Sequence, residues 1–174
     1  YFWLKMSFIS KWLKISFLNL FLVSVLGLVL RYKIVFSLPF VDQKNLLHSH
    51  SHFAFAGWVT QTLMVLLVYY LSVRLGEHVF ARYRLLLYAN LLTSYGMLVS
   101  FILQGYAFYS ICFSTLSILV FFSFGINFWN DLNRIREKTV SQLWFRWALI
   151  LGALSALGPF SLAYMTSEKI ADQN

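Results

Sequence analysis

The sequence predicts an all-α protein, a polytopic bundle of about five transmembrane helices. The 174-residue chain is 60% hydrophobic and only 11% charged, and its mean hydropathy is +0.70. A soluble domain of this size has too little interior to bury so much apolar surface. Long apolar runs also follow one another along the chain, separated by short polar segments. The lipid bilayer is therefore the expected environment of the protein.

Each apolar run is long enough to cross about 30 Å of hydrocarbon as a helix. The five runs cover residues 13–35, 46–72, 85–108, 111–130 and 143–165. The breaks between them are turn-forming or charged segments: Ser37–Pro39, Arg74–Arg84, Tyr106–Ser110 and Asp131–Gln142. No internal repeat is apparent. We therefore expect one integral membrane domain over residues 1–174, either complete or the N-terminal part of a longer subunit.

The basic residues predict the orientation of the bundle, because cytoplasmic loops of membrane proteins carry an excess of Lys and Arg. With the N-terminus in the cytoplasm and the C-terminus outside, ten of the 14 basic residues lie inside. The four that lie outside are Arg31, Lys33, Lys44 and Lys169. The net charge of +8 is spread over short segments between apolar runs, which does not indicate a nucleic-acid partner. We expect the inner membrane of a bacterium.

Three histidines, His48, His50 and His52, stand at the start of the second run, and the chain has only one other, His78. Polar side chains are costly at membrane depth and usually mark a functional site. Imidazole is also a common ligand of heme iron, copper and zinc. The cluster lies in the outer part of the membrane in the predicted orientation, and it is the main candidate site.

The spacing of the histidines restricts what they can bind together. On a regular α-helix His48 and His52 share a face, whereas His50 points largely elsewhere. One or two of them can therefore ligate a metal, but not all three in a straight helix. The residues that follow His50 on its own face are Ala54, Gly57 and Gln61. This face is small near the histidine, which would let a flat macrocycle lie against the helix.

Three interpretations of the cluster stay open at this point. The histidines are heme ligands, or they are structural residues that form hydrogen bonds within a larger membrane assembly. The third interpretation is a divalent-metal site made by His48 and His52, although no further ligands for zinc or copper are evident in the sequence.

Over residues 15–72 the chain resembles the N-terminal part of subunit I of the heme–copper oxygen and nitric oxide reductases. The resemblance rests on a basic end of the first run, a proline-containing outer segment and a histidine-led second run. These segments read Arg31-Tyr32-Lys33, then Leu38-Pro39, then Leu47-His48 through Gly57-Trp58. In that family a histidine of the second helix is an axial ligand of a low-spin heme.

The resemblance implies a heme-binding membrane protein that works in electron transfer. Matching Leu47-His48 assigns the axial ligand to His48, whereas matching His-x-His with Gly57-Trp58 favours His50 or His52. All three stay candidates, and His52 is preferred because it lies deepest along the second run. Arg31 would lie near the heme edge or its propionates, and Gly57 would lie in the heme-binding stretch. The second heme ligand would come from a C-terminal remainder or from another membrane subunit.

The chain departs from the family in one important respect. The family's copper-binding histidines and its other heme ligands lie on later helices, and no histidine of this chain follows His78. Copper is therefore not supported, and the chain alone lacks the ligands for oxygen reduction. Whether it is part of an oxidoreductase or a non-enzymatic subunit is left open by the sequence.

Overall fold

The computed structural model describes residues 2–137 and 139–158, with side chains from residue 8 onward. The described residues form helices and turns without a β-strand, which confirms the all-α prediction. The helices, in chain order, are α1 (Phe2–Val35), α2 (Gln43–His52), the π-helix η1 (Phe53–Thr60), α3 (Gln61–Leu75), α4 (His78–Gln104), α5 (Phe108–Arg134) and α6 (Val140–Ser155).

Four helical segments are long and apolar enough to cross a membrane: Phe8–Val35, Gln43–Leu75, His78–Gln104 and Phe108–Arg134. They correspond to the first four predicted runs, and the protein is an integral membrane protein by this measure. The second segment, called the second span below, joins α2, η1 and α3. The fifth predicted run corresponds in part to the 16-residue helix α6, and its residues 159–165 lie outside the described residues.

The boundaries of the third run differ from the prediction. The expected polar break Arg74–Arg84 is helical except for a tight turn at Gly76 and Glu77, and His78 begins α4 instead of lying in a loop. The sequence misled because its charged residues alternate with apolar side chains that are buried, such as Tyr83. At the other end α4 stops at Gln104, since Gly105 has φ +63°, a left-handed conformation that favours glycine.

The chain divides into two compact units, residues 1–124 and residues 125–174. Each unit is described separately, and the expectation of a single domain stays a prediction.

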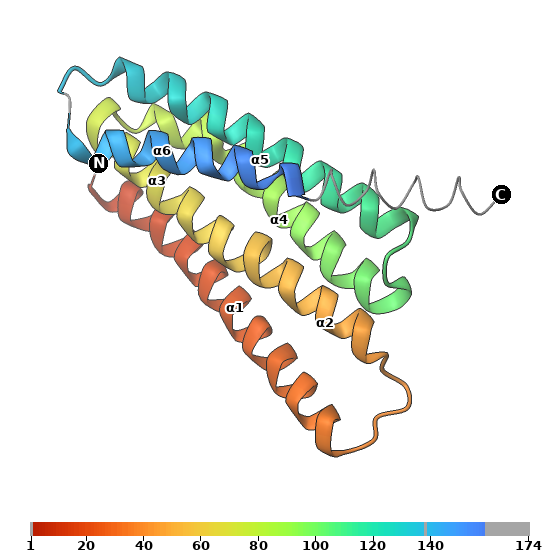
Figure 1. The fold of residues 1–174 in the computed structure, drawn as a ribbon. Coiled ribbons are helices and arrows are strands. Elements are labelled where there is room, and N and C mark those ends of the chain that lie inside the picture. Colours follow the sequence, from red (N-terminus) through yellow and green to blue (C-terminus); the bar gives the residue numbers. More distant parts are fainter. Residues whose placement is uncertain (1, 138, 159–174) are drawn as a thin grey trace, which may run out of the picture. The chain divides into compact units, whose positions relative to one another are not determined.

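In the first unit the second span lies between two other helices. Both α1 and α4 contact α2, η1 and α3, and Figure 1 shows the orange-to-yellow second span running beside red α1 and green α4. The core between these helices contains large apolar side chains that are fully buried. Examples are Phe53, Val65, Leu71, Leu87 and Phe101. This packing holds the start of the second span, and hence the histidines, between two neighbours.

In the second unit the end of α5 packs against α6 through aromatic and polar contacts. The rings of Phe128 and Phe145 lie 5.9 Å apart. The guanidinium of Arg146 lies 5.1 Å from the centre of the Trp129 ring and donates to Asn133 Oδ1 at 2.8 Å. These contacts are structural and involve none of the candidate site residues.

Candidate functional site

The start of the second span is held by local hydrogen bonds. Asp42 caps α2, because its side chain accepts a 2.8 Å hydrogen bond from the N–H of Asn45. Lys33 Nζ donates to the carbonyl of Leu38 at 2.7 Å and to that of Val41. Carbonyls in a loop near the membrane need such donors, so Lys33 has a structural reason to lie there, against the charge bias of the other basic residues.

His48 and His52 both face α4, which confirms that these two share one face of the helix. The His52 ring stacks on the buried ring of Phe101, with centroids 4.4 Å apart and an interplanar angle of 9°. The His48 ring lies edge-on to Tyr106 at 4.6 Å. We call these four residues, His48, His52, Phe101 and Tyr106, the histidine–aromatic cluster.

Tyr106 also forms a hydrogen bond within the histidine–aromatic cluster. Its hydroxyl lies 3.2 Å from Nε2 of His52. Tyr106 follows Gly105, where a Cβ would collide with the Asn45 amide, so glycine allows the α4 turn to approach α2 closely. Nearby, the buried hydroxyl of Ser49 donates to the Leu98 carbonyl at 2.7 Å. The α4-facing side of the histidine turn is therefore well packed and hydrogen-bonded.

His50 faces the other neighbour, α1. A Cβ built on Gly27 would lie 3.3 Å from His50 Cε1, so the imidazole packs where α1 has no side chain. Nδ1 of His50 is buried and has no hydrogen-bond partner among the described residues. Arg31 follows Gly27 by four residues and so lies one turn further along the same face of α1. Its side chain is exposed.

The histidines are followed directly by a π-helix, η1, instead of the regular α-helix assumed in the sequence analysis. The small stripe expected below His50 is therefore not continued in α-helical register. The space beside Gly57 is filled by its own helix, because a Cβ there would lie 2.6 Å from Cε2 of Phe53. π-Helical turns are rare and are frequent at functional sites.

Polar side chains from α1, α3 and α4 meet beside the π-helix. Asn19 Nδ2 donates to the carbonyl of Gly57, and Tyr95 donates its hydroxyl to Asn19 Oδ1 at 2.7 Å. Asn90 Nδ2 lies 3.0 Å from the carbonyl of Ala56 and 2.8 Å from Gln61 Oε1. We call Asn19, Gln61, Asn90 and Tyr95 the amide cluster.

Sequence reasoning missed several members of the site. Phe101 and Tyr106 were hidden among 18 Phe and 10 Tyr residues, where aromatic abundance does not discriminate. Gly27 was missed because a single glycine in an apolar run has no distinctive pattern. Its position four residues before Arg31 is the one signal that could have identified it.

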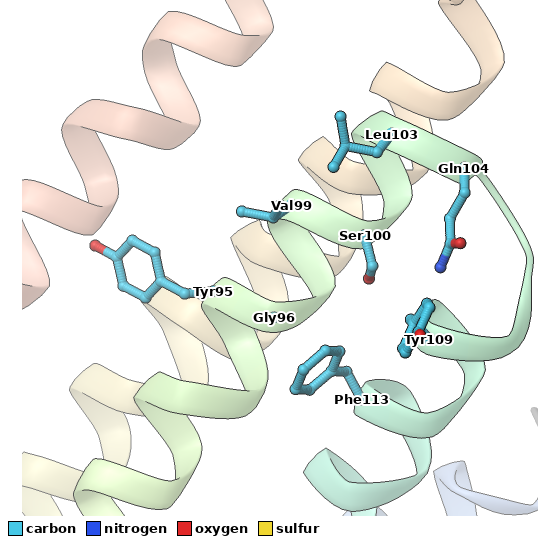
Figure 2. A pocket seen from close by; sticks show the side chains of 8 residues that line it. All are labelled: Tyr95, Gly96, Val99, Ser100, Leu103, Gln104, Tyr109 and Phe113. Carbon is cyan, nitrogen blue, oxygen red and sulfur yellow. The ribbon is translucent and has the colours of Figure 1, made fainter.

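A cavity of about 440 Å³ lies between α4 and α5 in the first unit, and no histidine lines it. Figure 2 shows Ser100, Gln104 and Tyr109 gathered on one side of α4, while Tyr95 points away from them. The ring of Phe113 packs onto Gly96. The cavity is therefore separate from the face of the helix that carries the histidine–aromatic cluster.

Within residues 2–137 and 139–158, no group of three or more His, Cys, Asp or Glu side chains is arranged to hold a metal ion. The three histidines are divided between two faces, so they do not converge on one point. Comparison of the chain with protein-family models, with curated proteins and with solved structures finds no significant match. The site therefore has to be interpreted from its own chemistry.

Proposed function

We propose that this chain is a heme-binding integral membrane subunit for electron transfer, resembling subunit I of the heme–copper oxidases. In this proposal the imidazole of His50 would hold a low-spin heme together with a ligand from another membrane subunit or a C-terminal remainder. The observation that carries the proposal is the buried, unpartnered Nδ1 of His50 beside the side-chain-free position Gly27.

The contacts favour His50 over the other two candidates. Nε2 of His52 is engaged by the Tyr106 hydroxyl, and one face of its ring is covered by Phe101. His48 packs edge-on against Tyr106. A buried polar atom without a partner is destabilising and needs an explanation, and His50 is the histidine that carries one. The preference for His52 on grounds of depth alone is therefore replaced by a preference for His50.

The described residues offer two groups to a shared heme site and do not form a complete one. The imidazole of His50 at the interface of α1 and α2 would hold the heme, and the exposed Arg31, one helical turn beyond Gly27, would provide a positive charge for a propionate. No group of three potential metal ligands accompanies them in the described part of the chain. A bound heme would supply one-electron transfer, at a potential set by ligand identity and burial.

The chain's own residues would hold and orient the imidazole. Packing against the backbone at Gly27 restricts rotation of the His50 ring. The hydrogen bonds of Lys33 to the loop carbonyls fix the segment that leads into α2. In the orientation proposed from the basic residues, this site lies in the outer part of the membrane, with the N-terminus in the cytoplasm of a bacterium.

A spectrum of the purified chain, produced in cells supplied with heme, tests this proposal. The wild-type protein should show a Soret band and a pyridine-hemochrome signal, with a free axial position that accepts added imidazole. His50→Ala should lose the heme, whereas His48→Ala and His52→Ala should keep it. A wild-type protein without any heme signal, unchanged by the three substitutions, would contradict the proposal.

A second candidate function is a non-enzymatic membrane subunit whose histidines are structural. The packing of His52 on Phe101 and its hydrogen bond with Tyr106 favour this candidate. It predicts that the triple alanine variant loses complex assembly and no cofactor. Metal analysis of the same sample identifies the remaining class, since a divalent-metal protein would co-purify with zinc or copper and without heme.

A further inference from the structure

At the end of the π-helix a backbone hydrogen bond departs from the α-helical pattern. The N–H of Gln61 donates to the Trp58 carbonyl, so it does not bond the Gly57 carbonyl as it would in an α-helix. The carbonyls of Gly57 and Ala56 accept hydrogen bonds from the side-chain amides of Asn19 and Asn90. Backbone groups at membrane depth must be satisfied within the protein, and these two amides contribute to this from opposite sides.

The two amides are almost completely buried and come from both neighbours of the second span. Asn19 on α1 is 0% exposed and Asn90 on α4 is 1% exposed. Tyr95 orients Asn19 by donating to its Oδ1 at 2.7 Å, which leaves the amide nitrogen to donate to Gly57. Gln61 accepts from Asn90 Nδ2 at 2.8 Å. Two adjacent carbonyls of η1 therefore each receive a side-chain donor, one from α1 and one from α4.

The π-helix determines the direction of the histidines relative to α3. Ser49, Phe53, Gly57 and Gln61 are all buried and are spaced by four residues. In an α-helix each residue turns about 100° around the axis, so positions four residues apart differ by about 40° in direction. Over three such steps the side-chain direction rotates by about 120° around the helix. The wider turns of a π-helix keep such positions on one side. Without the π-helix, the histidine turn would rotate relative to the rest of the span.

We propose that Asn19 and Asn90 are positioning residues that hold η1 as a π-helix. They thereby direct His50 toward Gly27 of α1 and the other two histidines toward α4. This role concerns the histidines of the proposed heme site, but it rests on the contacts of the protein alone. It is therefore testable whether or not heme binds.

Cross-linking of a cysteine pair measures the direction of position 50 directly. In a Cys112→Ser background, Gly27→Cys and His50→Cys place two thiols at the α1–α2 contact, and a short bifunctional thiol reagent joins them. A reference pair, Lys11→Cys and Tyr88→Cys, lies at the contact of α1 with α4, where Lys11 Nζ lies 3.3 Å from the Tyr88 hydroxyl. That contact does not involve the π-helix.

The variants Asn19→Leu and Asn90→Leu, singly and together, are then compared in both backgrounds. The double variant should lower cross-linking between positions 27 and 50 about eightfold, the change that two interhelical hydrogen bonds of average strength produce. The reference pair should be unchanged. Tyr95→Phe should have a smaller effect, because it removes the hydroxyl that orients Asn19 and leaves both amide donors in place.

Equal cross-linking between positions 27 and 50 in the parent and in the double variant would overturn the inference. If the double variant also loses cross-linking of the reference pair, the single variants Asn19→Leu and Asn90→Leu decide. In each of them the yield for the 27–50 pair is divided by the yield for the reference pair, and a ratio unchanged from the parent in both variants would also overturn the inference. Gln104→Leu is the matched control, since it removes an exposed amide of α4 away from η1. Absence of heme from the wild-type protein would remove the proposed function and leave this result valid.

Discussion

The two faces of the histidine turn differ in how completely they are packed. On the α4 side, His52 stacks on a buried aromatic ring and shares a hydrogen bond with a tyrosine hydroxyl. On the α1 side, His50 lies against Gly27, and its Nδ1 has no hydrogen-bond partner among the described residues. Most buried polar groups in proteins are hydrogen-bonded, so a buried group without a partner needs an explanation. Under the proposed function, this contrast favours His50 over His52 as the residue that binds the heme.

Among the substitutions that test this contrast, the largest loss of stability is expected at Phe101. This ring is 0% exposed and lies under His52, so Phe101→Ala should destabilise the protein by about 3–5 kcal/mol. The measurement is thermal or denaturant unfolding in detergent. Leu103→Ala on the same helix is the control, because Leu103 is 76% exposed and should change stability little. Equal effects of the two variants would show that the α4 face is not a packed core.

A smaller effect is expected from filling the position opposite His50. Gly27→Val adds methyl groups where the first added carbon already lies 3.3 Å from His50 Cε1. Overpacking of this kind should destabilise the protein by about 1–3 kcal/mol and should also displace the imidazole. Gly125→Val is the control, since its Cβ would be 3.5 Å from Leu149, an ordinary contact. A Gly27 variant as stable as the control would mean that His50 does not pack there.

The hydrogen bond on the α4 face can be removed without loss of packing. Tyr106→Phe keeps the ring beside His48 and deletes the hydroxyl that lies 3.2 Å from His52 Nε2. The expected loss of stability is about 0.5–1.5 kcal/mol, measured as above. Tyr109→Phe, an exposed tyrosine that lines the separate cavity, is the comparison. A stability change no larger than that of the comparison would leave His52 without a demonstrated polar partner.

The smallest effect is expected at Ser49, which joins α2 to α4. Ser49→Ala removes the hydroxyl that donates to the Leu98 carbonyl at 2.7 Å. Interhelical hydrogen bonds in membranes average about 0.6 kcal/mol, and the loss should be of that order. Ser51→Ala is the control because the Ser51 hydroxyl bonds carbonyls of its own helix. A difference between the two variants of several times this size would indicate that Ser49 also orients the histidines.

The sequence predicted the elements that depend on hydropathy and failed where local geometry decides. The first four apolar runs correspond to helices long enough to span a membrane. The π-helix was missed because a regular turn of 3.6 residues is the default expectation for an apolar run. The four-residue spacing of Ser49, Phe53, Gly57 and Gln61 was visible, but their burial, which makes the spacing meaningful, was not.

The site was predicted in part for the same physical reason. Periodicity correctly separated the face of His48 and His52 from that of His50, because side-chain direction along one helix turn follows from spacing alone. Which helix each face would meet depends on tertiary packing, and no pattern in the chain specified Gly27 or Phe101 as the partners. The helix start at His78 was likewise hidden, since charged residues on its exposed side resembled a loop.

The most direct test of the central claim is the heme content per chain of two purified variants, His50→Ala and His52→Ala, measured as pyridine hemochrome beside the wild-type protein. The contrast between the two faces predicts that His50→Ala loses the heme, while His52→Ala retains it at reduced stability. Retention of heme by His50→Ala together with its loss from His52→Ala would reverse the assignment and contradict the account.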